Sequence, residues 1–454
     1  MQRVVMKFGG TSVGVADNLT RAMALIESRI ARDEAAPLVV VSALSGVTDL
    51  LVRFCISPGE RSVLSGKLVD RHVAHALAMG LPAHALEQPL AAWHRCADTA
   101  GAEVLSPERC DEVLATGEWL SATLVAAALE ARGVAARAVE AGAAGLVTDD
   151  RFGAAHPLPE SRGRLAQSLP ASREVAVVTG FTGRTLDGRP TTLGRGGSDF
   201  TAAWIGAAIE ASEIEIWTDT SGMLSADPRV VAEARPVPEL SFTEASELAY
   251  FGAKVLHPKT LLPAIERGIA VRVLNTSRPE DPGSRITATA AAHTGAWRVK
   301  SIACRTGITA VTIVSSRMLM SHGFLARVFE VFGRHQLVVD LVTTSEVSIS
   351  VTLDDAHRLD AALADLEGIG EVEVRRGLAI VAVVGDGAPT QVGLAGHLFT
   401  LLGGIGVPVE MISQGASRVN LSFVVREEHA APSVRLLHRG LGLDVEHIEH
   451  ALTR

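Results

Sequence analysis

Along the first part of the chain, up to about residue 290, short continuous apolar runs alternate with longer stretches rich in alanine and leucine. A strand that is apolar throughout is buried on both faces, which is typical of a parallel sheet between helix layers. The pattern therefore predicts a three-layer α/β/α domain with a mainly parallel sheet. The predicted strands are Val4–Phe8, Leu38–Ser42, Val175–Thr179 and Ile214–Thr218, and the predicted helices are Asn18–Arg32, Glu118–Arg132 and Phe200–Glu210.

The segment Asn275–Gly295 is rich in proline, glycine, threonine and serine, which predicts the edge of the first domain followed by a linker. After it, the order β-α-β-β-α occurs twice, in units of roughly 75 residues. This order predicts two ferredoxin-like βαββαβ domains. The first unit comprises Ile308–Ser315, Gly323–His335, Leu337–Thr343, Val347–Leu353 and Ala356–Leu366, and the second Leu378–Gly385, Val392–Gly403, Val407–Ser413, Val419–Val425 and Ala431–Leu441.

Composition excludes several kinds of protein. A chain of 454 residues is too long for one core, and its net charge of -9 argues against a nucleic-acid partner or an anionic membrane surface. No apolar run reaches the roughly 20 residues that span a bilayer, and the N-terminus lacks the features of a signal peptide. We therefore expect a cytoplasmic protein. None of the four cysteines forms a CxxC pair, and no spacing predicts a metal bound by the protein.

The segment Lys7–Ser12 (KFGGTS) ends the first predicted strand and leads into a helix. Its two glycines let the backbone approach a phosphate closely, and the helix N-terminus adds N–H donors. Because the lysine precedes the glycines, the segment is not a Walker A loop. It indicates phosphate binding, and the structural alternative is a tight turn between strand and helix.

Residues 10–14 (GTSVG) also match the nucleophile elbow of α/β-hydrolases, with Ser12 as the nucleophile. Several strands normally precede such an elbow, whereas here it follows the first predicted strand. The interpretation also leaves the other motifs unexplained. A serine hydrolase is therefore the alternative from a different enzyme class, and a non-catalytic amino-acid sensor is a third hypothesis.

Two further segments are suited to a small substrate. Ser42–Thr48 (SALSGVT) follows a buried strand, and hydroxyl groups at the carboxyl end of a strand suit substrate binding in an open α/β sheet. Glu118 lies where a helix is predicted to begin and could bind an ammonium group. The structural alternatives are helix capping by Ser45 or Thr48 and an interaction of Glu118 with the helix dipole.

The densest motif is Thr191–Asp199 (TTLGRGGSD). Arg195 has a planar guanidinium group that binds a carboxylate through two hydrogen bonds. The glycines on both sides of it expose backbone N–H groups to an anion. A plain loop would explain the glycines but not the arginine and the aspartate among them.

Two later segments add positive charge. Residues 217–219 (WTD) lead to residues 225–229 (SADPR), which include Arg229, and residues 251–258 (FGAKVLHP) include Lys254. Two lysines from separate loops can neutralise the charge on a transferring phosphoryl group. The motifs together predict a phosphotransferase that uses ATP and acts on a small carboxylate.

In their order and spacing, KFGGTS, GRGGSD, WTD…DPR and FGAKVLHP resemble the motifs of the aspartate kinases of the amino acid kinase family. The C-terminal repeats look like the paired ACT domains of these enzymes, and the likeness is to the monofunctional lysine-sensitive class. The resemblance covers essentially the whole chain. It implies ATP-dependent phosphorylation of the β-carboxylate of L-aspartate to 4-phospho-L-aspartate. This is the first step of lysine, threonine and methionine biosynthesis, with feedback inhibition by an amino acid.

The resemblance also implies roles for individual residues. Lys7, Asp199 and Lys254 would be catalytic, Arg195 would bind the α-carboxylate of aspartate, and Glu118 would hold its ammonium group. The aspartate pocket would comprise Ser42, Thr48, Glu118, Phe181, Arg195, Gly196, Gly197 and Ser198. ATP would be bound by Lys7, Phe8, Gly9, Gly10, Thr218, Asp219, Leu224, Arg229, Lys254 and Val255. Mg²⁺ is implied on the phosphates, bound mainly by nucleotide and water.

The first repeat matches the lysine pocket of the lysine-sensitive class. The matching positions are Met318, Ser321, Phe324, Leu325, Val338, Val339, Asp340, Ser345 and Glu346. The chain departs from the family at Val338, where a small polar residue is common, and at Leu224, where an aromatic residue is common. Threonine is the alternative inhibitor, because residues 384–387 (VGDG) are closer to the threonine-sensitive relatives.

The resemblance places the domain boundaries as follows. The kinase domain would span residues 1–292, with a linker at 293–300. The first ACT domain would span 301–377, completed by a strand near 446–454, and the second would be inserted as 378–445. ACT domains pair across a dimer, so a homodimer or a dimer of dimers is expected.

Overall fold

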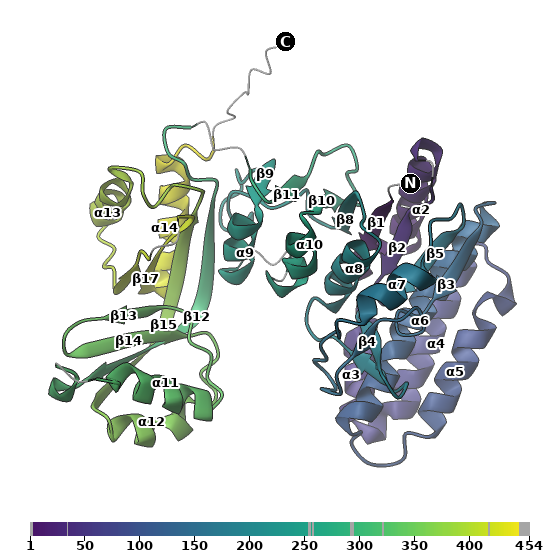
Figure 1. Ribbon diagram of the computed structural model, residues 1–454, viewed down its shortest axis with the longest axis horizontal. Helices are drawn as coiled ribbons and strands as arrows, with labels where there is room; N and C mark the ends of the chain where they lie inside the picture. The colour runs from purple at the N-terminus through teal and green to yellow at the C-terminus, as the bar shows by residue number, and fades with distance from the viewer. Residues whose placement is uncertain are drawn as a thin grey trace, which may run out of the picture. The chain divides into compact units, whose positions relative to one another are not determined.

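The computed structural model describes residues 3–33, 35–252, 256, 258–290, 295–319, 322–415 and 418–444. The chain forms two compact units (Figure 1). The first unit comprises Met1–Met223, Pro238–Phe242 and Val255–Ala290, and the second comprises Leu224–Val237, Thr243–Lys254 and Ala291–Arg454. Two short segments from the predicted kinase domain therefore group with the C-terminal repeats. The finer domain boundaries given above stay a prediction.

The first unit is built on an eight-stranded sheet, in which the neighbouring strands are parallel except for the antiparallel pair β10 and β11. In spatial order the strands are β3 (Ala136–Val139), β5 (Val175–Thr179), β2 (Leu38–Val41), β1 (Val4–Phe8), β8 (Glu213–Thr218), β10 (Ala270–Asn275), β11 (Ser284–Thr287) and β9 (Glu239–Ser241). Every residue of β1, β2 and β5 is buried, as their continuous apolar runs indicate. The predicted mainly parallel sheet is confirmed.

Helices cover both faces of this sheet (Figure 1). Alternate residues of β1 point into a core that it shares with α2 to α6, and α7, α8 and α10 pack together on the other face. The helices are α1 (Gly10–Val13), α2 (Ala16–Arg32), α3 (Val47–Ile56), α4 (Arg61–Ala78), α5 (Glu87–Asp98), α6 (Pro107–Ala131), α7 (Ser161–Ser168), α8 (Gly197–Ala208) and α10 (Leu262–Arg267). A small sheet adds β4 (Val147–Thr148), β6 (Thr182–Thr185) and β7 (Pro190–Thr192).

Helix α6 begins at Pro107, well before the predicted start at Glu118. Ser106 caps it by accepting a hydrogen bond from the backbone N–H of Arg109 (3.3 Å), and a proline is favoured in the first turn. Among the described residues, α6 is the one helix long and apolar enough to cross a membrane, and 67% of its most apolar stretch is buried. This burial is what a core helix of the first unit requires.

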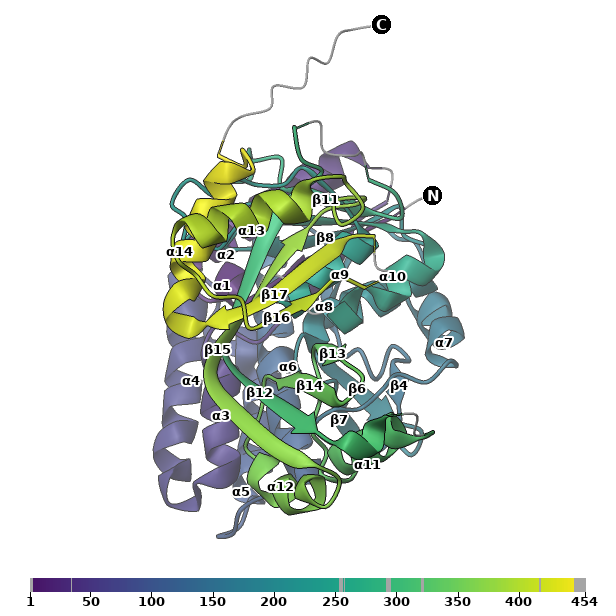
Figure 2. The same cartoon turned by 90° about the vertical axis from the view of Figure 1, so that its left-hand side faces the viewer.

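The second unit contains one six-stranded sheet (Figure 2). Its strands, in spatial order, are β13 (Val342–Thr344), β14 (Ser348–Leu353), β12 (Ser301–Val314), β15 (Glu371–Val384), β17 (Asn420–Arg426) and β16 (Met411–Ser413). Its helices are α9 (Phe242–Tyr250), α11 (Phe324–Arg334), α12 (Leu359–Glu367), α13 (Leu394–Gly404) and α14 (Glu427–Gly440). The two predicted β-α-β-β-α repeats are confirmed, with β12 and β15 starting earlier than their apolar runs.

The long antiparallel pair of β12 and β15 joins the two repeats. The second half of β12 and the first half of β15 complete a four-stranded sheet with β13 and β14, which packs against α11 and α12. The first half of β12 and the second half of β15 form the corresponding four-stranded sheet with β16 and β17, which packs against α13 and α14. Each repeat therefore takes its fourth strand from the other. The strand expected near residues 446–454 lies outside the described residues.

Candidate functional site

The predicted motifs of the first unit follow strands that end at one edge of the sheet. Parallel pairing aligns Phe8 of β1 with Val41 of β2 and with Trp217 of β8. The same alignment brings Thr179 of β5 beside Val41. Ligands of open α/β sheets bind at this carboxyl edge. The structure thus brings the KFGG, SALSG and WTD segments together, as the motif interpretation required.

Lys7 and Asp199 form an ion pair, with 2.6 Å between Lys7 Nζ and Asp199 Oδ1. Lys7 is in β1, and Asp199 lies in the first turn of α8. Their side chains are only 10% and 13% exposed, so the pair is held in a partly desolvated position. Such a pair fixes the ammonium group at the carboxyl edge of the sheet. The third predicted catalytic residue, Lys254, lies outside the described residues, as does Val255.

The two glycines after β1 allow the loops to pack closely. The N–H of Gly9 donates to the carbonyl of Trp217 (3.2 Å), and the carbonyl of Gly10 accepts from the N–H of Ser45 (3.1 Å). A side chain at Gly10 would bring its Cβ within 2.8 Å of the carbonyl oxygen of Ala43. Glycine is therefore required at position 10, and the loop after β1 is locked against the loop after β2.

Glu118 lies in α6 beneath the loop that carries Ser42. Its side chain is buried, and Oε1 accepts a hydrogen bond from the N–H of Ala43 (3.3 Å). Burial raises the pKa of Glu118 to about 8, and the bond from Ala43 offsets only part of that effect. A carboxylate that is costly to ionise alone is suited to a cationic partner such as a substrate ammonium group. Ser42 and Thr48, which lie close to Ala43 in the sequence, are half-buried.

Arg195 lies between Gly194 and Gly196, both of which have a φ of 73°. This left-handed conformation favours glycine, and Gly196 directly precedes α8. Arg195 is exposed and has no ion-pair partner among the described residues. Its guanidinium group can therefore bind an incoming carboxylate. Ser198, in the first turn of α8, is buried.

Phe181 adopts a strained backbone conformation next to this loop. Its φ of 65° is rare for a residue with a side chain and costs roughly 1–3 kcal/mol. The N–H of Phe181 donates to Thr201 Oγ1 (3.1 Å), and a Cβ on Gly197 would lie 2.6 Å from the Phe181 ring. The surroundings therefore impose the strain, which places Phe181 against the start of α8.

Asp111 of α6 was missed by the sequence analysis, although it positions the arginine loop. Its side chain is completely buried. Oδ2 accepts hydrogen bonds from the N–H groups of Thr192 (2.8 Å) and Gly153 (2.9 Å), and Oδ1 accepts from Thr192 Oγ1 (2.6 Å). Asp111 precedes Glu118 by two helical turns, so both lie on one face of α6. The spacing of Asp111 and Glu118 indicates a shared helix face only when the helix is known to begin at Pro107.

Ser12 has no base beside it in the described structure. Its hydroxyl is buried and lies 2.7 Å from Thr276 Oγ1 and 3.3 Å from the carbonyl oxygen of Trp217. Neither group can take a proton as a histidine does in a hydrolase. Ser12 therefore joins the loops after β1, β8 and β10, and the serine hydrolase interpretation is not supported.

The predicted nucleotide contacts are divided between the two units. Thr218 ends β8 and Asp219 follows it; the Asp219 side chain is exposed and accepts a hydrogen bond from Thr218 Oγ1 (3.2 Å). The Phe8 ring stacks on Trp217, with 6.1 Å between the ring centroids. Leu224 and Arg229 belong to the second unit. Their roles stay a prediction.

Three predicted regulatory residues, Met318, Phe324 and Val339, pack around the core of the first repeat. Phe324 is 2% exposed and is therefore a core residue, whereas Leu325 is 38% exposed and Val338 is 72% exposed. Ser321 lies outside the described residues.

The polar members of this predicted pocket differ in burial. Asp340 is almost completely buried, and its Oδ1 accepts a hydrogen bond from the hydroxyl of Tyr250. Ser345 and Glu346 are exposed in the turn between β13 and β14, where Ser345 Oγ lies 2.7 Å from Ser348 Oγ. Asp340 is thus the buried acidic group of the pocket.

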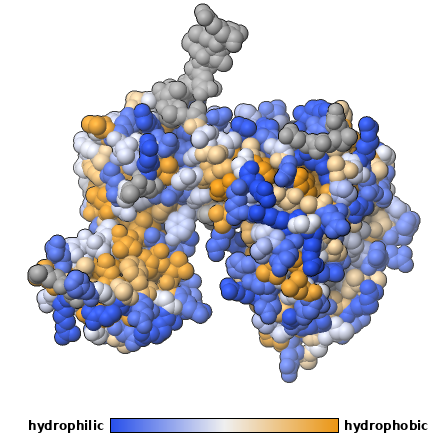
Figure 3. Space-filling model, in the orientation of Figure 1, coloured by the Kyte–Doolittle hydropathy of each residue, from blue (hydrophilic) through white to orange (hydrophobic). Residues whose placement is uncertain are grey.

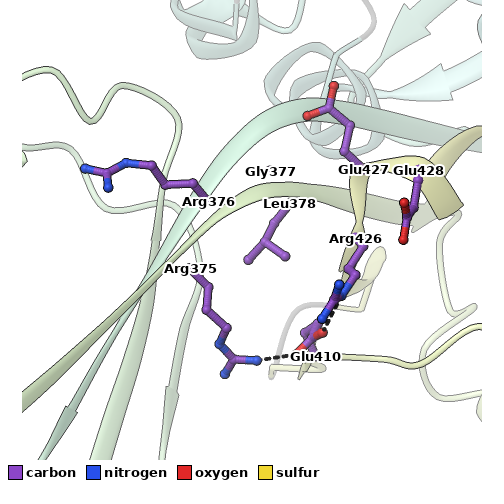
Figure 4. A pocket seen from close by; sticks show the side chains of 8 residues that line it. All are labelled: Arg375, Arg376, Gly377, Leu378, Glu410, Arg426, Glu427 and Glu428. Atoms are coloured by element: carbon purple, nitrogen blue, oxygen red, sulfur yellow. Dashed lines mark hydrogen bonds and ion pairs between the residues drawn. The ribbon is translucent and has the colours of Figure 1, made fainter.

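A separate polar groove crosses β15 and β17 in the second unit (Figure 4). Its lining residues are Arg375, Arg376, Gly377, Leu378, Glu410, Arg426, Glu427 and Glu428. Glu410 pairs with Arg375 and lies 3.8 Å from Arg426. No residue of the predicted sites lines this groove, and its charges neutralise one another.

Comparisons with known proteins identify two family models that match the chain. The amino acid kinase family model matches residues 2–275, and an ACT domain model matches residues 311–367 and 381–441. The lysine-sensitive aspartokinase 3 of Escherichia coli is 38% identical over 453 residues, which cover 96% of this chain and 99% of the relative.

Two solved structures of E. coli aspartokinase III are similar over 97% of this chain and 100% of theirs. The complex with aspartate and ADP, in the R-state, is 36% identical with a TM-score of 0.82. The complex with lysine and aspartate, in the T-state, is 37% identical with a TM-score of 0.77.

Proposed function

The chain belongs to the amino acid kinase family and acts as an aspartokinase, and we propose that Lys7, Asp199 and Glu118 are central to the reaction. The observation that carries this proposal is the ion pair of Lys7 and Asp199 beside the glycine loop at the carboxyl edge of the sheet. This arrangement provides a fixed positive charge where backbone groups can approach a phosphate. The substrates are ATP and L-aspartate.

The α-carboxylate and the ammonium group of aspartate would each bind a side chain of opposite charge. The exposed guanidinium of Arg195 would bind the α-carboxylate, and the buried carboxylate of Glu118 would bind the ammonium group. The β-carboxylate is ionised at neutral pH, so no general base is needed. The strained Phe181 and the buried Asp111 keep the intervening loop in place.

Phosphoryl transfer would then proceed in line. An oxygen of the β-carboxylate forms a bond to the γ-phosphorus of ATP while the bond to the ADP oxygen breaks. Lys7 would stabilise the charge on the transferring group, with Asp199 fixing its position and Lys254 as the second lysine. Mg²⁺ would neutralise phosphate charge, bound by nucleotide and water. No cluster of three or more His, Cys, Asp or Glu in the described part of the chain offers a metal site of its own.

The repeats would provide feedback inhibition by lysine. The similarity to the lysine-sensitive relative supports this assignment, and the buried carboxylate of Asp340 is a suitable partner for an ammonium group. Threonine is the alternative inhibitor. Separate titrations of the two amino acids in a coupled kinase assay decide between them.

A homodimer, or a dimer of such dimers, would be the functional form, located in the cytoplasm. Strand β13 lies at one edge of the six-stranded sheet, with unpaired backbone groups. Val338, Val342 and Val347 are exposed at this edge, and Figure 3 shows apolar residues (orange) gathered on this part of the second unit. A second copy would cover them.

Trapping with hydroxylamine tests the proposed function. The full-length protein should form aspartyl hydroxamate only when ATP, Mg²⁺ and L-aspartate are all present. Lys7→Ala should lower kcat by at least about 100-fold, because it removes a charge that acts on the transition state. Lys67→Ala, an exposed lysine of α4, is the control and should retain activity. Absence of aspartate-dependent hydroxamate would refute the proposal.

A further inference from the structure

Asp340 makes a contact that none of the sequence motifs anticipates. Its side chain is 3% exposed, and Oδ1 accepts a hydrogen bond from the hydroxyl of Tyr250, the last residue of α9. Its Oδ2 is buried and has no hydrogen-bond partner within the described residues. A buried carboxylate with one oxygen bonded and the other open is suited to a positively charged donor.

Arg305 of β12 holds Tyr250 in this position. Its guanidinium carbon lies 5.6 Å from the centroid of the Tyr250 ring, and Nη1 donates to the Tyr250 carbonyl oxygen (3.3 Å). The same Nη1 is 4.0 Å from Asp340 Oδ1, which is too long for a hydrogen bond, and Nη2 pairs with Asp354. Arg305 therefore compensates the charge of Asp340 only in part. Burial correspondingly raises the pKa of Asp340.

The residues after Tyr250 are packed tightly against the same strand. Gly252 has a φ of 125°, and a Cβ there would lie 2.5 Å from the carbonyl oxygen of Cys304, so glycine is required. The Phe251 ring packs edge-on against Tyr250, with 5.0 Å between the centroids. In the sequence, the proposed catalytic Lys254 is only four residues beyond Tyr250. Displacement of Tyr250 would therefore act on Phe251 and Gly252, the described residues that directly follow it.

We propose that the ammonium group of the inhibiting amino acid competes with the Tyr250 hydroxyl for the carboxylate of Asp340, so that inhibitor binding releases the end of α9. The inference rests on the proposed function, because it takes Asp340 as part of the inhibitor site. A cationic donor forms a stronger hydrogen bond to a carboxylate than a neutral phenol does. Tyr250 is then a positioning residue that favours the uninhibited arrangement.

The variant Tyr250→Phe tests the competition, since it removes the hydroxyl and keeps the ring beneath Arg305. A lost hydrogen bond to a charged group shifts such an equilibrium by about tenfold, so the half-inhibitory concentration of L-lysine should fall by about that factor. Thr312→Val is the matched control, because it removes a hydroxyl contact to Ser350 in the same sheet away from Asp340. An unchanged or increased half-inhibitory concentration in Tyr250→Phe would overturn the inference.

A second measurement uses the native side chain, since Tyr250 is the only tyrosine of the chain. Full-length protein labelled with 3-fluorotyrosine should give one ¹⁹F resonance that shifts with lysine, with its midpoint at the half-inhibitory concentration. Asp340→Asn should abolish this shift. If lysine inhibits and the resonance stays in place, the inference is wrong while the proposed feedback stands.

Repeating the ¹⁹F titration with threonine shows which amino acid is the inhibitor and whether the competition holds for it. If threonine inhibits and shifts the resonance, the competition holds with threonine as the inhibitor. If neither amino acid inhibits or shifts the resonance, the proposed feedback and the inference fail together.

Discussion

At the residue scale, the candidate site depends on charges held away from water. Lys7 and Asp199 compensate each other, whereas Glu118 accepts a hydrogen bond from the N–H of Ala43 and has no ion-pair partner among the described residues. The raised pKa of Glu118 follows from this difference, because burial disfavours an ionised carboxylate that lacks a counter-charge. A substrate ammonium group would supply the missing charge, and its binding would be coupled to loss of a proton from Glu118.

This coupling predicts a pH dependence. Below pH 8 the carboxyl group of Glu118 is protonated and must lose its proton before it binds the ammonium group, so kcat/KM for aspartate should rise about tenfold per pH unit up to about pH 8. Glu118→Gln should remove that rise and increase KM for aspartate by about 10- to 100-fold. Initial rates between pH 6 and 9 measure both effects.

Glu112→Gln is the control for this prediction. Glu112 lies on the same helix, and its exposed side chain pairs with Arg109. This variant should keep the wild-type pH profile. A Glu118→Gln enzyme with the same rise would show that another group titrates.

At the element scale, side-chain contacts of two glutamates tie α9 to the sheet of the second unit. Glu244 Oε2 lies 3.0 Å from Lys300 Nζ, and its Oε1 accepts from the N–H of Asp386 (2.8 Å). One turn later, Glu247 accepts from Asn420 Nδ2 (2.9 Å). These contacts hold α9 to the residue before β12, to the loop after β15 and to the first residue of β17.

Removal of Lys300 should loosen this anchor. The two side chains of the Lys300 and Glu244 pair are 5% and 0% exposed, so Lys300→Met leaves a buried carboxylate without its lysine counter-charge. Breaking a buried pair in this way costs about 3–5 kcal/mol. Hydrogen exchange of the α9 and β12 amides, followed by mass spectrometry, should show a lower opening free energy of that size.

The double variant Glu244→Gln with Lys300→Met completes a mutant cycle. Glutamine is neutral and still offers an acceptor to the N–H of Asp386, so much of the lost protection should return. Equal losses in the single and double variants would mean that the ion pair does not determine the stability of α9.

At the scale of the whole molecule, the second unit is one sheet made from two repeats. β12 and β15 each run for 14 residues and contribute a half-strand to both repeats. The repeats therefore cannot unfold or move as independent domains without breaking this pair. The edge strands of the sheet are β13 and β16, which lie near each other, and the apolar edge of β13 is where a second copy would bind.

A charge at this edge should weaken the proposed dimer. Val342→Lys places an ammonium group among exposed valines, which should raise the dimer dissociation constant by at least about tenfold in sedimentation velocity. Val392→Lys is the matched control, since Val392 is 97% exposed in the same unit and lies away from β13. Dissociation by Val392→Lys alone, or by neither variant, would contradict the proposed interface.

The sequence by itself indicated the chemistry, because the candidate motifs are local. Lys7, Arg195 and Asp199 lie in segments at strand and helix ends, and parallel strands necessarily bring the ends of strands to one edge. Glu118 was placed at the start of a predicted helix, whereas it lies in the middle of α6. The predicted helix at Glu118 was too short because the cap at Ser106 lies outside the apolar run. Asp111 was not predicted as a site residue for the same reason, because it lies in the first part of α6, before the predicted start of the helix.

The tertiary structure alone decided which distant residues meet. The hydrogen bond from Tyr250 to Asp340 joins positions 90 residues apart, and no local periodicity encodes such a pair. The exchange of half-strands between the repeats was equally invisible, since an apolar run shows that a strand is buried but not which strand lies beside it. Burial then set the raised pKa of Glu118, because desolvation depends on everything packed around a group rather than on its neighbours in sequence.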